Sequence, residues 1–421
     1  MRRGILAVIL GCLLFVGQSV TAIEEAEIEQ GNIDTEIEQA IQEREDASEL
    51  YDTPIFLEEE SSIDLQQSQL INQTKEHSKF YNSFVQNVKE VYALQIENTN
   101  AVSALLAKPL TWDIEKGPVE KLHLWGTLGT NMDANFPQGD DSTVDYNVHN
   151  INVLLDGKLR SGKEDFSLML DITPMHKTFF KAFIQDAYIQ THRMPHHSLL
   201  VGNSRPYVGY EGAQSPYTLP LMTRSQISRH FGAVRKAGVR LKGNYTYASY
   251  DLGAYSSDTF FTEFMPGTEF DGWINFKPLA KLDKRYGELI AGGGLVSGDR
   301  NNKDFLVSGA VLGYEYKRIW FRSEYAISDG SNGATGFNDR KREGWYATLG
   351  YHLTPRVELV ARYDEFDNDR NIKNNNRREY TAGMNYYVKG QALKLILNYI
   401  YAQTQNQLDS HKLLLGTQLI L

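Results

Sequence analysis

Apolar and polar residues alternate along the last two segments of the chain. In the C-terminal segment HKLLLGTQLIL, Leu413, Leu415, Leu419 and Leu421 fall on one face, and Lys412 and its alternate neighbours fall on the other. Successive side chains of a β-strand point to opposite faces, so one face of this strand is apolar and the other is mixed. This pattern is typical of a transmembrane β-strand of about ten residues with lipid on one side and water on the other.

The same period of two recurs through the C-terminal three quarters of the chain and predicts about sixteen strands. Lipid offers no hydrogen-bond partner to an open sheet edge, so the fold class we predict is an all-β transmembrane barrel, closed and antiparallel. The predicted strands cover residues 120–131, 147–160, 165–173, 182–192, 198–204, 235–244, 246–256, 268–277, 286–297, 305–316, 318–328, 343–353, 356–366, 378–388, 391–404 and 411–421.

The links between these strands alternate in length. The links at one end are brief, such as Thr354-Pro355 and Lys389-Gly390, and most links at the other end are long and polar, such as 133–146, 204–234 and 328–342. Bacterial outer-membrane barrels have short periplasmic turns and longer extracellular loops. The alternation therefore places the first strand's start in the periplasm.

The N-terminus is typical of a secretory signal peptide, residues 1–22. Arg2 and Arg3 precede an apolar run from Ile5 to Val16, which contains Cys12, the only cysteine of the chain. The run is too short to span a bilayer as a mature helix, so cleavage is expected. The mature protein would then have no disulfide bond.

Two further segments precede the barrel, which we predict over residues 114–421. Residues 23–64 carry sixteen acidic residues against Arg44 alone, and this composition favours a solvated, flexible leader. Residues 65–113 have apolar positions at alternating steps of three and four. This helical periodicity predicts either a multimeric periplasmic coiled coil or a single amphipathic helix at the barrel mouth.

The link from Ser204 to Val234 is the longest, and loops of this length in compact folds are usually functional. It is cationic, with Glu211 as its one acidic residue. We predict that it narrows the lumen and favours anions, because desolvated charges set pore selectivity. Alternatively, its arginines pair with carboxylates of the wall and only fix the loop. The candidate constriction residues, including those at the loop's exit, are Arg205, Arg224, Arg229, His230, Arg235 and Lys236.

Strand parity also predicts which charged side chains face a water-filled lumen. Acidic candidates such as Glu324 and Asp364 alternate with basic ones along single strands, which favours cross-strand ion pairs. The basic lumen-lining candidates are Lys158, Arg160, Arg240, Lys242, Arg322, Arg362 and Lys394.

Several short motifs resemble the phosphate-selective porin O and P family. In the run 186–212, Asp-Ala-Tyr is followed by Val201-Gly202 and Arg205-Pro206-Tyr207 at the start of the long link. The segments 222–225, 237–239, 359–364 and 383–387 resemble later motifs of that family. The resemblance implies sixteen strands, a homotrimer, an N-terminal periplasmic coiled coil and anion uptake. A siderophore-type porin, which also joins a helical leader to a barrel, is a weaker match.

Other function classes lack the residues they need. The ten histidines are scattered, and there is no serine elbow, phosphate loop or HExxH motif, so we expect no enzyme, no metal site, no cofactor and no nucleic-acid partner. An outer-membrane receptor or surface adhesin that uses its extracellular loops remains the alternative. The preferred hypothesis is a bacterial outer-membrane porin whose partners are membrane lipid and small hydrophilic solutes, chiefly anions.

Overall fold

The computed structural model describes residues 110–173, 183–258, 263, 265–282, 286–405 and 407–420. The predicted signal peptide, the acidic leader and most of the predicted helical segment lie outside the described residues. Among the described residues, no helix is both long enough and apolar enough to cross a lipid bilayer.

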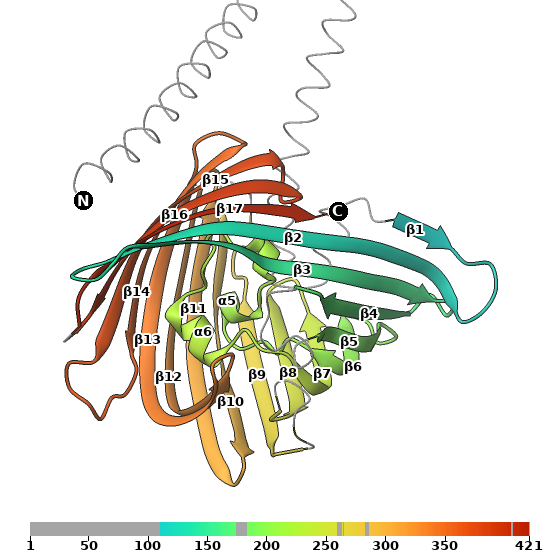
Figure 1. Ribbon diagram of the computed structural model, residues 1–421. Helices are drawn as coiled ribbons and strands as arrows, with labels where there is room; N and C mark the ends of the chain where they lie inside the picture. Colours follow the sequence, from blue (N-terminus) through green and yellow to red (C-terminus); the bar gives the residue numbers. More distant parts are fainter. Residues whose placement is uncertain are drawn as a thin grey trace, which may run out of the picture. The chain divides into compact units, whose positions relative to one another are not determined.

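Sixteen antiparallel strands form a closed ring (Figure 1). Each strand pairs with the next one along the chain, and β17 pairs with β2 to close the barrel. All sixteen predicted strands are therefore present. The strands are β2 (Val119–Pro137), β3 (Thr143–Leu159), β4 (Glu164–Asp171), β5 (Ile184–Thr191), β6 (His197–Ser204), β7 (Lys236–Asn244), β8 (Ala248–Ser256), β9 (Thr268–Phe276), β10 (Glu288–Arg300), β11 (Lys303–Tyr316), β12 (Ile319–Gly333), β13 (Gly336–His352), β14 (Val357–Asp367), β15 (Asn376–Lys389), β16 (Leu393–Thr404) and β17 (Ser410–Ile420).

The barrel is apolar outside and polar inside. In β16, Leu395 and Tyr399 are 40% and 43% exposed, whereas Lys394 and Asn398 are fully buried. Soluble proteins bury leucine and expose lysine, because burial of an unpaired charge is costly. The reversal along one strand indicates a lipid-facing exterior and a polar interior.

A row of aromatic side chains borders the apolar exterior on five neighbouring strands. Trp345, Tyr363, Tyr380, Tyr401 and His411 come from β13 to β17, and successive ring centroids lie 4.9 to 5.9 Å apart. Amphipathic rings concentrate at membrane–water interfaces. The row thus marks one edge of the band that contacts lipid.

Two of the links predicted to be long are largely strand. Residues 328–342, expected to be a loop, form the end of a hairpin in which β12 and β13 pair as far as Gly333 and Gly336. Likewise, β2 reaches Pro137 and β3 begins at Thr143. Polar, glycine-rich residues suggested solvent-exposed loops, but cross-strand backbone hydrogen bonds continue the ladder beyond the apolar band. Strand length was therefore underestimated at this end of the barrel.

A short additional strand, β1 (Leu110–Asp113), was not predicted. Its residues were assigned to the helical segment, yet they pair with Lys121–Leu124 of β2. β17 reaches only Thr127 of β2, so β1 occupies part of the β2 edge that β17 leaves open. Pro109 cannot donate a helical hydrogen bond, and the open edge offers backbone partners instead.

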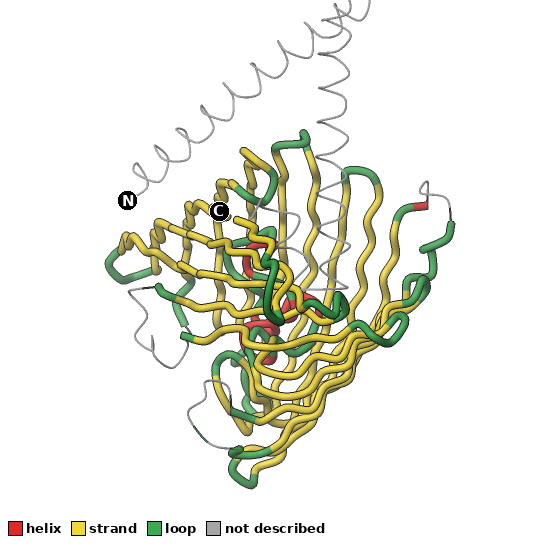
Figure 2. The backbone as a smooth tube through the Cα atoms, turned by 90° about the vertical axis from the view of Figure 1, so that its right-hand side faces the viewer, coloured by secondary structure: helices red, strands yellow, loops and turns green. Residues whose placement is uncertain are grey.

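The longest link joins β6 to β7 and comprises residues 205–235, which we call the long loop. It contains α5 (Tyr210–Ala213), the 3-10 helix η1 (Pro216–Thr218) and α6 (Gln226–Phe231). These helices lie within the ring of strands (Figures 1 and 2). Gly209, at a φ of 72°, precedes α5 in a left-handed conformation that suits glycine.

Candidate functional site

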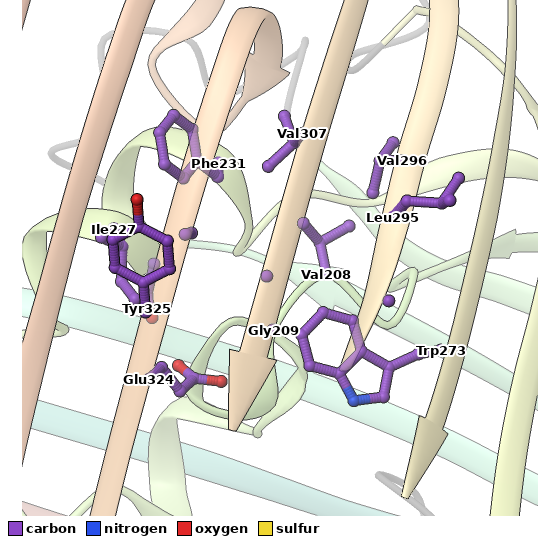
Figure 3. Close-up of a pocket in the computed structure, with 14 residues that line it drawn as sticks. Val208, Gly209, Ile227, Phe231, Trp273, Leu295, Val296, Val307, Glu324 and Tyr325 are labelled. Atoms are coloured by element: carbon purple, nitrogen blue, oxygen red, sulfur yellow. The ribbon is translucent and has the colours of Figure 1, made fainter. Parts of the chain in front are cut away.

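The long loop packs on one side of the inner wall through an apolar cluster. Val208, Ile227 and Phe231 of the loop contact a patch on the inward face of β10 to β14 (Figure 3). A cavity of about 20 Å³ remains between them, enough for about one water molecule. The wall residues of this cluster are Val296, Phe305, Val307, Ala326, Tyr346 and Phe366.

Two glutamates fix the same side of the loop by polar contacts. Glu211 lies 3.2 Å from Arg362 of β14 and accepts hydrogen bonds from Ser225 N at 2.7 Å and Ser228 Oγ at 3.0 Å. Glu324 of β12 accepts from the backbone N–H of Tyr210 at the start of α5. Buried backbone N–H groups need hydrogen-bond acceptors. The carboxylate of Glu324 in the wall is the acceptor that the short helix α5 cannot provide for its own first N–H group.

The middle of the loop contacts a further part of the wall, on β16 and β2. Tyr217 accepts from Thr127 Oγ1 of β2 at 2.8 Å, and Lys394 of β16 donates to the Leu219 carbonyl at 2.9 Å. Asn398 of β16 accepts from Met222 N at 2.8 Å. The loop therefore bonds to inward-facing side chains of β12, β14, β16 and β2.

Three of the candidate constriction residues pair with carboxylates of the wall. Arg229 lies 2.8 Å from Glu379, Arg235 lies 2.9 Å from Asp186, and Lys236 at the loop's exit pairs with the fully buried Glu269. At these three positions the geometry matches the alternative in which basic residues fix the loop in place.

Arg205 and Arg224 have a different environment. Arg205 Nη1 donates to the Gln214 carbonyl at 3.2 Å, and Arg224 Nη2 donates to the same oxygen at 2.6 Å. In the described part of the chain, both guanidinium groups are held by backbone carbonyls and not by a carboxylate. Their positive charge is therefore not neutralised by direct contact.

Electrostatic coupling shows that Arg205, Arg224 and Arg235 form one group, which we call the arginine cluster. Burial, followed by the positive charges of Arg235 and Arg224, lowers the pKa of Arg205. Burial also lowers the pKa of Arg224 to about 10, which leaves the side chain cationic at neutral pH. Three guanidinium groups thus gather near one directly paired carboxylate, that of Asp186.

His230 belongs to the packing of α6 and not to the arginine cluster. Its ring stacks on Phe366 with centroids 4.4 Å apart, and Arg342 Nη1 approaches its Nδ1 at 3.2 Å. Burial, and after it the charges of Arg342 and Arg229, lower the pKa of His230 to about 4. The imidazole is therefore neutral at neutral pH and contributes no positive charge to the lumen.

The basic lumen-lining candidates divide into two groups. Lys158 and Arg160 are exposed near the short turn after β3, where Arg160 donates to the carbonyls of Gly117 and Ile114. Arg240 Nε donates to Asp251 at 2.7 Å, and Arg322 Nε donates to Tyr210 Oη at 3.2 Å. The members of the second, buried group are Arg240, Lys242, Arg322, Arg362 and Lys394.

Sequence reasoning missed Arg342, Glu269 and Glu379. Arg342 is 1% exposed and donates to Ser331 at 3.0 Å, but it fell in a segment assigned to a loop. Glu269 and Glu379 lie on the inward face of β9 and β15. The parity rule that selected Glu324 and Asp364 also selects these two positions. Among the described residues, no group of three or more His, Cys, Asp or Glu residues is placed to hold a metal ion.

Residues 283–420 match the family described as phosphate-selective porin O and P. No curated protein sequence matches the chain.

Several solved structures share the fold at low sequence identity. The anion-selective porin from Comamonas acidovorans is 12% identical, with a TM-score of 0.55 over 71% of this chain and 99% of that one. The outer membrane channel DcaP of Acinetobacter baumannii is 11% identical, with a TM-score of 0.52 over 74% and 99%. Pseudomonas putida OprB is 10% identical, with a TM-score of 0.53 over 76% and 96%.

Proposed function

We propose that this protein is an outer-membrane porin. Its motifs resemble the phosphate-selective porin O and P family, and the match of residues 283–420 to that family confirms the resemblance. It would allow passive diffusion of small hydrophilic solutes and prefer anions, phosphate among the possible ones. The closed barrel with exposed leucine and buried lysine supports a membrane location. The arginine cluster within the barrel is the observation that carries the anion preference.

The long loop is the proposed constriction. It lies within the ring of strands, bonds to inward-facing side chains of β14 and β2, and so reduces the open cross-section. A narrow, partly dehydrated passage strengthens the effect of fixed charge on ions that enter it. Arg205 and Arg224, whose partners among the described residues are backbone carbonyls, would lower the energy of an anion there and raise that of a cation.

The proposal extends to the arrangement of the rest of the chain. The short turns would face the periplasm, as in bacterial barrels generally. Residues 1–22 would be removed, residues 23–64 would form a flexible leader, and residues 65–109 would form a periplasmic helical segment. If that segment is a coiled coil, it would join three copies of the chain into a homotrimer.

Planar-bilayer recording with a KCl gradient tests the anion preference. Replacement of Arg205 and Arg224 together by glutamine should move the reversal potential toward cation selectivity. The matched control replaces Arg160 and Arg193 together by glutamine. Both side chains are exposed near short turns, so this variant removes the same amount of charge at positions where solvent screens it. Equal shifts in the two double variants would exclude the arginine cluster as the selective element.

The same recording separates the porin from the alternative of a receptor or adhesin. The bonds from the loop to several strands of the wall, among them β14 and β16, are the observation that favours a closed lumen. A porin gives stepwise ohmic openings in KCl, whereas a barrel closed by its loop gives none.

A further inference from the structure

The links at the short-turn end of the barrel are strongly basic. The seven links at this end, from the one between β3 and β4 to the one between β15 and β16, contain ten Lys and Arg residues against one acidic residue, Asp283. At the other end, exposed lysines pair with carboxylates, as Lys303 does with Asp339 at 2.9 Å and Lys341 with Asp329 at 3.0 Å. The two ends of the barrel therefore differ in charge.

The turn between β11 and β12 places two of these cations side by side. It consists of Lys317 and Arg318, and both residues are exposed. Lys317 Nζ lies 5.0 Å from the centroid of the Tyr316 ring, and Arg318 Nη1 donates to the Leu353 carbonyl at 3.3 Å. Because the turn has only two residues, the paired strands fix the position of both cations.

The carboxylates on the neighbouring strands face the interior of the barrel. Glu315 lies 3.7 Å from Arg322, which is buried on the inner wall. Glu358 of β14 is fully buried and accepts from Trp320 Nε1 at 2.7 Å. The two cations of the turn are in contact with solvent, so burial imposes no cost on their charged forms. The outer surface of this turn is therefore positively charged.

The outer surface next to the turn is apolar and carries tyrosine rings. Ile319 and Tyr351 are cross-strand partners and are 49% and 39% exposed. In the next row of the sheet, Phe321 pairs with Tyr314 on one side and with Leu349 on the other, and these two are 38% and 52% exposed. Tyrosine concentrates where the lipid headgroups begin, and aliphatic side chains contact the acyl chains.

A phospholipid with a net negative charge matches this order of groups. Its phosphate needs cations at the membrane surface, and its acyl chains need an apolar wall directly beside them. Lysine and arginine side chains at the edge of the apolar band reach the headgroup level while their carbon stems remain on apolar surface. The turn and the wall beside it provide both parts on one face of the barrel.

We propose that the turn between β11 and β12 binds an anionic phospholipid, with the phosphate at Lys317 and Arg318 and the chains on Ile319 and Leu349. The site rests on the proposed function only in that the barrel spans a bilayer with its short turns at the periplasmic leaflet. It takes no part in ion flow. The bound lipid would hold this end of the barrel at a fixed depth in that leaflet.

Native mass spectrometry of the full-length protein, released from detergent micelles, tests the site by counting bound lipids. Dioleoyl phosphatidylglycerol should be retained at a lower concentration than dioleoyl phosphatidylcholine, which has the same chains and a phosphate but no net charge. Lys317→Gln combined with Arg318→Gln should weaken phosphatidylglycerol binding at least about tenfold. The matched control combines Lys303→Gln with Arg340→Gln, two exposed cations that pair with Asp339 and Asp369, and should change the affinity less than about twofold.

Equal affinity for the two lipids, or equal loss in the two double variants, would overturn the assignment. Displacement of the lipid by inorganic phosphate at equal concentration would show that the turn binds free phosphate and not a headgroup. Lys317 has a φ of 53°, so Lys317→Arg combined with Arg318→Lys serves as a check on the turn itself. This variant keeps both charges and should retain the affinity within about threefold. KCl conductance is recorded separately, so failure of the porin proposal and failure of the lipid site give different results.

Discussion

The carboxylate of Glu211 lies 3.2 Å from the guanidinium of Arg362 and joins the long loop to β14. The two side chains are 9% and 1% exposed. The same carboxylate accepts the hydrogen bonds of Ser225 N and Ser228 Oγ at α6. One residue thus links the start of the loop, its second helix and the wall.

Glu211→Gln should therefore lower the stability of the barrel and loosen the loop. Loss of this carboxylate leaves the buried Arg362 with only one carboxylate contact among the described residues, the longer one of 4.0 Å to Asp364, so the free energy of unfolding should fall by about 3 kcal/mol. Urea unfolding in detergent, followed by tryptophan fluorescence, measures this change.

The control for this variant is Glu343→Gln, at an exposed ion pair with Arg370. The side chains of that pair are 38% and 41% exposed, and their atoms lie 3.0 Å apart. Solvent screens such pairs, so the expected loss is below about 1 kcal/mol. A loss at Glu211 no larger than that at Glu343 would contradict the anchoring role.

The strands were predictable because lipid imposes a simple rule on each of them. Leu395 faces outward and Lys394 inward, and this alternation is readable from the sequence alone. The hairpin around Asn332 was not readable in this way. Its side chain donates to the Ser257 carbonyl at 2.9 Å, and a strand that leaves the lipid band loses its apolar alternation.

Partner choice within the lumen was not predictable either. Arg229 and Glu379 stand far apart in the sequence, and only the packing of α6 against the wall brings them together. Composition identified the long loop as cationic. It gave no means of separating Arg229, which has a carboxylate partner, from Arg224, which has carbonyl partners.

The apolar contact of Phe231 should hold the loop against the wall. Phe231 is 5% exposed, and its ring lies 5.7 Å from that of Phe366. Phe231→Ala leaves a cavity and should destabilise this contact by about 3 to 5 kcal/mol. Trypsin should then cut at Arg224 or Arg229 faster than in the wild type.

The control for this experiment is Phe270→Ala, which removes an outward-facing ring of β9 that is 59% exposed. It should leave the rate of cleavage in the loop unchanged. Equal protection of the loop in the wild type and in Phe231→Ala would show that the polar anchors alone suffice.

The low pKa of His230 should make stability depend on pH below neutrality. In the folded state the pKa of His230 is about 4, against 6.5 for an ordinary histidine. Burial lowers it most, followed by the positive charges of Arg342, Arg229 and Arg377, and these together exceed the opposite effect of the Glu379 carboxylate. Between these two values the unfolded state binds the proton and the folded state does not. The free energy of unfolding therefore falls as the pH drops from 6.5 toward 4, by at most about 2 kcal/mol between pH 7 and pH 5.

His230→Phe removes the titrating group and keeps the ring that stacks on Phe366 at 4.4 Å. The variant should lose less stability than the wild type between pH 7 and pH 5, measured by urea unfolding at both values. Other groups titrate equally in the two proteins, so the difference between the two losses isolates the imidazole. Identical losses would mean that His230 takes up its proton as readily in the folded barrel as in the unfolded chain, and that neither its burial nor Arg342 keeps it neutral.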